Sequence, residues 1–192
     1  MSDDLNVFLD SIAAGDDVRT EEAALAVGRL GDDALPALRD LVKDADPDRR
    51  WWAARALAAV GTDEARTLLV PALSDPDLDV RACAAQGLGE LRAEEAVPAL
   101  VRCMATPSSF VSRIAADSLA RIGYPAVPAL IAALKEGKAP ARSGAARALS
   151  IIQPQEAVPA LCEALDDPSA VVTHYAEEAL ERMGVGLVLF HP

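Results

Sequence analysis

Carboxylate side chains are the first candidates for chemistry in this sequence, because several of them are adjacent. The pairs are Glu94–Glu95, Asp166–Asp167 and Glu177–Glu178, and two carboxyl groups can divide the roles of general acid and general base. Neighbouring residues on a helix, however, point about 100° apart. We therefore interpret these pairs as solvated helix surface or helix caps, and not as catalytic groups.

Histidine and cysteine offer little more chemistry. Two histidines, His174 and His191, are too few to build a metal shell. The three cysteines, Cys83, Cys103 and Cys162, form no Cys-x-x-Cys pair, and each lies in an apolar stretch typical of a small buried side chain. Phosphate-binding glycine loops, nucleophile elbows and zinc-protease motifs do not occur in the sequence. We therefore expect no catalytic residue, no metal and no cofactor.

Composition and charge narrow the class of protein further. Hydrophobic residues make up 52% of the 192 residues and aromatic residues only 4%, and the abundant alanine favours closely packed helices. The apolar runs are far shorter than the roughly 18 residues of a membrane-spanning helix, and the acidic start is unlike a secretory signal. We expect a cytoplasmic acidic protein with no membrane partner. The net charge of −12 also makes nucleic acid an unfavourable partner.

A short segment recurs along the whole chain at a nearly constant spacing, which is the signature of a repeat protein. A second motif, Leu/Val-Pro-Ala-Leu, keeps the same spacing and places proline in the first turn of a helix. Each copy is therefore predicted to be a helix, a turn and a second helix. The segment begins at Ala23, Ala53, Ala84, Ala115, Ala145 and Ala176. We place the repeats at 4–31, 32–61, 62–92, 93–123, 124–153 and 154–184, in a single domain over 1–192 with an apolar tail at 185–192.

Two amphipathic helices cannot bury their apolar faces alone, but stacked neighbours can. The second helix of each repeat carries one column of leucines and one column of alanines that hardly change from copy to copy, and the small alanines let helices approach closely. For the same reason we interpret "GLGE" at 87–90 as close packing inside a helix. The fold is predicted to be an all-α solenoid, a superhelix of about six helix-turn-helix repeats. The leucine column comprises Leu57, Leu88, Leu119, Leu149 and Leu180.

Arginine recurs near the start of the second helix, at Arg50, Arg81 and Arg142. A guanidinium group at this position can reach aspartates of adjacent turns, such as Asp75 or Asp79. We predict a ladder of such pairs that sets the stacking register, which is a structural role and not a catalytic one.

The string "DPDLDVRACAAQGLGELRAEEAVPAL", residues 75–100, resembles the HEAT-like repeat of the phycobilisome-lyase type. The resemblance extends over nearly the whole chain and implies a helical superhelix with a concave binding face. Its relatives include adaptor proteins, bilin lyase subunits, hydroxylases with His-Glu iron ligands and DNA glycosylases. No His-Glu dipeptide occurs here, and the acidic balance opposes DNA binding, so the adaptor and bilin-lyase branches stay open.

Four columns of the second helix lie opposite the leucines and change in size, charge and polarity from copy to copy. A position that packs one repeat on the next must keep its volume, whereas an outward position need not. We therefore predict that these columns line one open face. The columns also contain Glu21, Arg29, Arg113, Ile151, His174, Glu178 and Arg182. The residues selected as partner contacts are Trp51, Trp52, Arg55, Gln86, Asp117, Arg121, Arg147 and Tyr175.

The adjacent tryptophans are the strongest members of this set, because Trp, Tyr and Arg dominate the affinity of protein interfaces. Trp51 and Trp52 are predicted to flank the open face as aromatic anchors. The alternative is that one of them covers the seam with a neighbouring repeat, against Leu25 or Ala82.

Two functions remain after these exclusions. The leading hypothesis is a non-catalytic scaffold or adaptor that presents its concave face to a protein or peptide. The alternative is a subunit similar to a bilin lyase, which handles a chromophore or its carrier protein. The apolar tail at 185–192 is predicted to cover the last helix, or else to contact a partner or a second copy of the chain.

Overall fold

The structure is a computed structural model that describes residues 2–185, and all regular secondary structure within that range is helical. The chain divides into two compact units, residues 1–91 and 92–192, which are described separately. The predictions for the tail fall outside the described residues, apart from Val185.

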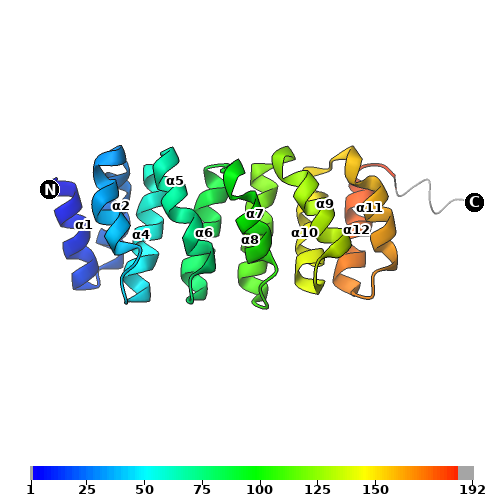
Figure 1. The fold of residues 1–192 in the computed structure, drawn as a ribbon, viewed down its shortest axis with the longest axis horizontal. Helices are drawn as coiled ribbons and strands as arrows, with labels where there is room; N and C mark the ends of the chain where they lie inside the picture. The colour runs from blue at the N-terminus through cyan, green and yellow to red at the C-terminus, as the bar shows by residue number, and fades with distance from the viewer. Residues whose placement is uncertain (1, 186–192) are drawn as a thin grey trace, which may run out of the picture. The chain divides into compact units, whose positions relative to one another are not determined.

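The first unit consists of three consecutive helix pairs in its described part (Figure 1). Within it the second helices α2, α4 and α6 pack on one another in series, and each also packs on its own first helix. Short 3-10 turns, η1 (Gly31–Ala34) and η2 (Val70–Ser74), lie beside α3 and α5. The pairs are α1 (Asp3–Ala14) with α2 (Asp17–Gly28), α3 (Leu35–Leu41) with α4 (Pro47–Val60), and α5 (Asp63–Leu69) with α6 (Leu78–Glu90).

The second unit repeats this arrangement in its described part, with α8, α10 and α12 packed in series. Its 3-10 turns are η3 (Glu94–Ala96), η4 (Tyr124–Ala126), η5 (Gln155–Ala157) and η6 (Ala164–Asp166). The pairs are α7 (Val97–Met104) with α8 (Ser109–Ile122), α9 (Val127–Glu136) with α10 (Ala139–Ile152), and α11 (Val158–Glu163) with α12 (Ala170–Arg182). The predicted all-α solenoid of paired helices is thereby confirmed.

Local sequence explains where the helices begin and end, as α4 illustrates. Its N-cap, Asp46, accepts a hydrogen bond from the backbone N of Asp48 at 3.0 Å, and Pro47 occupies the first turn, where its missing N–H costs little. Gly61 ends the helix in the left-handed region, with φ 66°, which glycine adopts without a steric penalty.

The predicted apolar columns form the core of each unit. Leu57 and Leu88 in the first unit, and Leu119 and Leu149 in the second, are fully buried, and Leu180 is 2% exposed. Complete burial of a leucine side chain contributes about 1.5–3 kcal/mol. The recurring alanines at the start of the repeated segment are also buried, which permits close contact between successive second helices.

The segment at 87–90 is a site of close packing, as predicted. A Cβ atom added to Gly87 of α6 would lie 2.6 Å from the Cβ of Ala58 on α4 and 3.3 Å from the Cδ2 of Leu69. Only glycine lets these two second helices approach so closely at this point.

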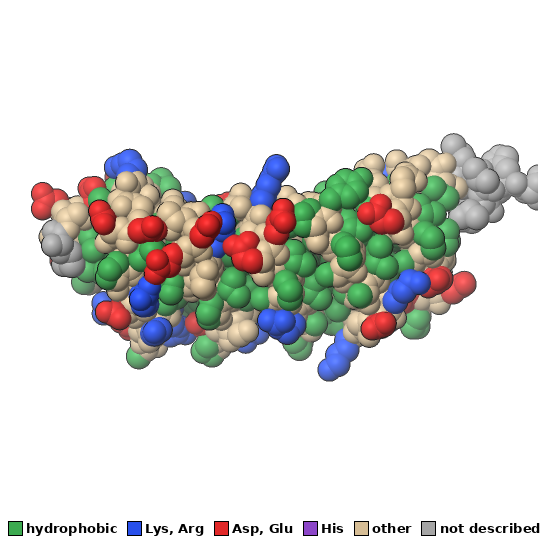
Figure 2. Space-filling view, turned by 45° about the horizontal axis from the view of Figure 1, so that its top comes forward, with side chains coloured by type: hydrophobic (Ala, Val, Ile, Leu, Met, Phe, Trp, Pro, Cys, Tyr) green, Lys and Arg blue, Asp and Glu red, His purple; other side chains and the backbone are tan. Residues whose placement is uncertain are grey.

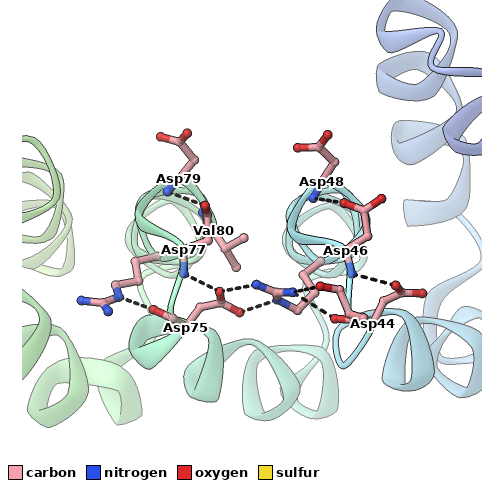
Figure 3. Close-up of polar contacts among 10 residues, drawn as sticks. Asp44, Asp46, Asp48, Asp75, Asp77, Asp79 and Val80 are labelled. Carbon is pink, nitrogen blue, oxygen red and sulfur yellow. Dashed lines mark hydrogen bonds and ion pairs between the residues drawn. The ribbon is translucent and has the colours of Figure 1, made fainter.

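The predicted arginine ladder is present in both units, with one correction. In the first unit Arg50 of α4 holds Asp75 with two hydrogen bonds, from Nε to Oδ2 and from Nη2 to Oδ1, both 2.8 Å (Figure 3). Its Nη1 also donates to the backbone O of Asp44 and of Ala45 at 3.0 Å. Arg81 also reaches Asp75 as predicted, but its Nε donates to the backbone carbonyl of Asp75.

The second unit contains a matching pair between Arg142 of α10 and Asp167, with Nε–Oδ2 at 2.6 Å and Nη2–Oδ1 at 3.0 Å. The hydrogen bond from Arg142 is the largest influence on the Asp167 carboxyl group and holds its pKa below the ordinary value. For Asp75 burial is the largest influence and opposes ionisation, yet the Arg50 and Asp77 hydrogen bonds together lower its pKa.

Each aspartate of the ladder also orders the backbone at the start of the next helix. Asp75 Oδ1 accepts a hydrogen bond from the backbone N of Asp77 at 2.9 Å, and Asp167 Oδ1 accepts one from Ser169 at 2.8 Å. Figure 3 shows the aspartates of "DADPD" and "DPDLD" in the same arrangement at the starts of α4 and α6. These carboxylates therefore join neighbouring repeats and hold the N-cap residue of the next helix in place.

Candidate functional site

The candidate site consists of the outward sides of the second helices. These sides form one surface in each unit, and the two surfaces together are called the second-helix faces. In the first unit the outward side of α2, α4 and α6 is called the α2–α4–α6 face. Its central interaction is an ion pair between Arg55 of α4 and Glu21 of α2, with Nε–Oε2 at 3.1 Å. Gln86 on α6 is exposed, and its Nε2 donates to Glu90 Oε1 at 2.9 Å. Leu25, on the same face of α2, is 48% exposed.

The two tryptophans of α4 occupy different environments. Trp52 is only 9% exposed, so it packs inside the unit and is not available as a partner contact, which corrects the prediction for this residue. Trp51 is half-buried. The two rings meet edge to face, with centroids 4.7 Å apart and planes at 89°, a favourable aromatic geometry. Trp52 therefore supports Trp51 at the edge of the face.

Cys83 lies beside Trp51 but is unsuited to nucleophilic chemistry. Its Sγ is 3.8 Å from the backbone O of Trp51. Burial raises the pKa of the thiol to about 12, so the thiol stays protonated at neutral pH.

In the second unit the outward side of α8, α10 and α12 is called the α8–α10–α12 face, and Arg147 is its centre. The Nε of Arg147 is 2.8 Å from Asp117 Oδ1 on α8, and its Nη1 is 3.1 Å from the hydroxyl of Tyr175 on α12. The guanidinium carbon also lies 5.6 Å from the Tyr175 ring centroid, within cation–π range. The Asp117 hydrogen bond is the largest cause of the raised pKa of Arg147.

A row of three residues crosses the last turns of the same helices. It consists of Arg121 on α8, Ile151 on α10 and Arg182 on α12, and all three are exposed. Ile151 is 45% exposed. Arg182 pairs with Glu178 at 2.7 Å and donates to the backbone O of Ser150 at 3.2 Å. Arg121 has no ion-pair partner among the residues that the structure describes.

The structure thus joins some of the predicted residues directly and leaves others apart. Asp117, Arg147 and Tyr175 form one connected group, Arg55 is tied to Glu21, and Arg121 and Gln86 are exposed. Sequence reasoning placed Ile151, Arg182, Arg113 and Glu21 in the outward columns but did not select them. The signal for Ile151 and Arg182 is that they recur at the Arg121 position in the next two repeats.

The described part of the chain was also searched for metal sites and for membrane-spanning helices. Between residues 2 and 185, no cluster of three or more His, Cys, Asp or Glu side chains could hold a metal ion. In the same range, no helix has the length and apolar character needed to cross a bilayer.

Comparison with known proteins defines the class as an all-α helical-repeat protein. The family model described as HEAT repeats matches residues 6–78, 35–120, 66–142 and 111–181. Because these matches together span most of the chain, the protein belongs to the HEAT-repeat family, and the resemblance to HEAT-like repeats is confirmed. A comparison with curated proteins found no match.

Several solved structures share the fold. YibA of Escherichia coli is 22% identical with a TM-score of 0.60, over 98% of this chain and 74% of its own. The complex of CpcE and CpcF of phycocyanin lyase from Nostoc sp. PCC7120 is 23% identical with a TM-score of 0.54, over 94% of this chain and 77% of its own. A designed armadillo repeat protein in complex with the peptide (KR)4 is 19% identical with a TM-score of 0.51, over 95% of this chain and 100% of its own. At these identities the likeness shows the fold alone.

Proposed function

We propose that this protein is a non-catalytic scaffold that binds a protein or peptide through its second-helix faces. The observation that carries the proposal is the contrast between two sides of the same helices. All five residues of the leucine column are buried, whereas the outward columns change from tryptophan to arginine, glutamine, aspartate and isoleucine. Packing alone gives no reason for exposed positions to carry such residues, whereas recognition of a partner does.

The polar contacts on these faces support the same function. Arg55 and Arg147 are each held by a carboxylate from the preceding second helix, so their side chains are already ordered before a partner arrives. Preorganised side chains lose less conformational entropy on binding. The designed armadillo protein is in complex with a peptide, which is consistent with such a role for a fold of this class.

The alternative of a bilin-lyase-like subunit is not adopted. Its support is a likeness of 23% identity to CpcE and CpcF, and a likeness at this level shows the fold alone.

The proposal is tested by measuring how partner binding responds to loss of Trp51. Proteins that co-purify with the chain are identified by mass spectrometry, and the affinity of the purified partner is measured by calorimetry. We expect Trp51→Ala to weaken binding by about 2 kcal/mol, because a half-buried tryptophan at an interface is typical of a hot spot.

Tyr124→Ala is the matched control, since Tyr124 is an aromatic residue that is 62% exposed in η4, outside both faces. Circular dichroism of each variant checks that it folds. Equal affinity of wild type and Trp51→Ala, together with a loss in Tyr124→Ala, would mean that the partner binds elsewhere.

A further inference from the structure

The α8–α10–α12 face differs in charge from the rest of the chain. Residues 1–91 contain 19 acidic and nine basic side chains, and residues 92–192 contain 11 and nine. The acidic side chains crowd the surface toward the N-terminal end in Figure 2. The outward columns of α8, α10 and α12, by contrast, hold four arginines and only two carboxylates, namely Arg113, Arg121, Arg147, Arg182, Asp117 and Glu178.

The carboxylates on this face do not neutralise all its arginines. Asp117 is shared by Arg147 at 2.8 Å and Arg113 at 3.5 Å, and Glu178 is taken by Arg182. Arg121 has no ion-pair partner among the described residues. A locally basic surface in an acidic chain favours a ligand that carries carboxylates.

The row of Arg121, Ile151 and Arg182 adds a geometric constraint. These residues occupy corresponding positions near the ends of three helices that pack in series, and packed helix axes lie about 8–10 Å apart. An apolar residue therefore lies between two arginines, and the backbone positions of the three residues are about one helix spacing apart.

This spacing matches one particular backbone conformation. The polyproline II helix has about three residues per turn and rises about 3.1 Å per residue, so its side chains return to the same side every 9.3 Å or so. A β-strand turns successive side chains to opposite faces, so residues three apart do not share a side.

We infer that the Arg121–Ile151–Arg182 row binds an acidic segment of a partner protein in the polyproline II conformation, with one carboxylate for each arginine and an apolar side chain against Ile151. This inference rests on the proposed function and names the chemistry of its partner. A nucleic acid fits less well, because its phosphates follow each other continuously and would meet the acidic remainder of the chain, and because it has no aliphatic side chain for Ile151.

The test uses the full chain and a fluorescein-labelled peptide with a central leucine and one glutamate on each side at the spacing of one polyproline turn. Fluorescence anisotropy is expected to report binding that weakens as salt is raised. A peptide of the same composition with its two glutamates adjacent, and one with lysines in place of the glutamates, should bind at least about tenfold more weakly.

Variants of the chain test the assignment of residues. Arg121→Glu is expected to weaken binding of the acidic peptide by about tenfold or more. Ile151→Ser is expected to weaken it by a smaller factor. Arg29→Glu is the matched control, because Arg29 is exposed and occupies the same column, directly after the end of α2 in the first unit. It makes the same charge change away from the row and should leave affinity within about twofold. The double variant Arg121→Glu/Arg182→Glu should instead prefer the lysine peptide.

The inference would be overturned by equal affinity for the two glutamate arrangements, by equal losses in Arg121→Glu and Arg29→Glu, or by stronger binding of single-stranded DNA than of the acidic peptide. Concentration-dependent self-association that Arg121→Glu abolishes, without peptide binding, would assign the row to a second copy of the chain and would also overturn it. If the peptide fails while Trp51→Ala still weakens the natural partner, only the present inference fails and the proposed function stands.

Discussion

Arg50 and Arg147 show how one residue type serves two purposes in this chain. Both are held by an aspartate 2.8 Å away. Arg50 and Asp75 are 12% and 9% exposed in their side chains, whereas Arg147 and Asp117 are 29% and 22% exposed. The first pair is therefore part of the packing between repeats, and the second stays accessible to a partner.

The Arg50–Asp75 pair should contribute to stability in a pH-dependent way. The pKa of Asp75 is lowered in the folded state, so its contribution is complete above the unfolded value of about 3.9 and is lost as pH falls through the lower folded value. We expect Arg50→Ala to reduce the free energy of unfolding by about 2–4 kcal/mol at neutral pH. The difference from wild type should shrink in acid, as measured by urea denaturation at several pH values.

Arg39→Ala is the control for this prediction, because Arg39 forms an exposed ion pair with Glu64. Exposed pairs contribute about 0–1 kcal/mol. A constant effect of Arg50→Ala from neutral to acid pH would show that the carboxylate of Asp75 is not the partner that matters.

Single residues also show where sequence reasoning reached its limit. The arginine ladder was predictable, because Arg50 and Arg142 each stand 25 residues before their aspartate. The burial of one tryptophan was among the alternatives, but which of the two is buried was not predictable. Helical periodicity places Trp51 and Trp52 about 100° apart, but the side that is covered depends on where the neighbouring helix lies, which the angle around one helix does not contain.

Two glycines mark close approaches between neighbouring helices. Gly87 faces Ala58 in the first unit, and Gly144 in the second faces Met104, whose Cγ and Sδ would be 2.6 Å from an added Cβ. The two sites differ in what can move. A methionine side chain is flexible, whereas the Cβ of Ala58 is fixed to the backbone of α4.

This difference predicts that the same substitution is tolerated less well at Gly87 than at Gly144. Gly87→Ala should destabilise the chain by about 1–3 kcal/mol through overpacking, although alanine is the better helix former by about 1 kcal/mol. Gly144→Ala should cost less, because Met104 can adopt another rotamer. Thermal unfolding followed by circular dichroism compares the two variants, and a larger loss in Gly144→Ala would contradict the packing described for Gly87.

The buried side of the second helices follows well from the sequence, whereas the residues that contact a partner follow less well. The leucine column identified the buried side of each second helix in advance, because apolar residues recur with the helical period. The selection of contact residues stays a prediction, since a column of unlike residues identifies an outward side but does not rank its members. Ile151 gained its importance from exposure beside Arg182, which only the packing of α10 on α12 reveals.

At the scale of the whole molecule, the repeat architecture separates stability from recognition. Stability comes from columns that are the same in every copy, and each copy depends mainly on its neighbours. The outward positions are therefore free to differ, and the distribution of charge differs with them, from a strongly acidic first unit to an arginine-rich face in the second. The central claim is that these outward positions, and not the first helices, meet the partner.

Side-chain footprinting by mass spectrometry of the chain with and without its purified partner tests this claim most directly. The account predicts protection at outward residues of the second helices, such as Trp51, Tyr175 and Ile151, with Tyr124 in η4 unchanged. Protection confined to the exposed sides of α3, α5, α7 and α9, with the labelling of Trp51 and Ile151 unaltered, would contradict it.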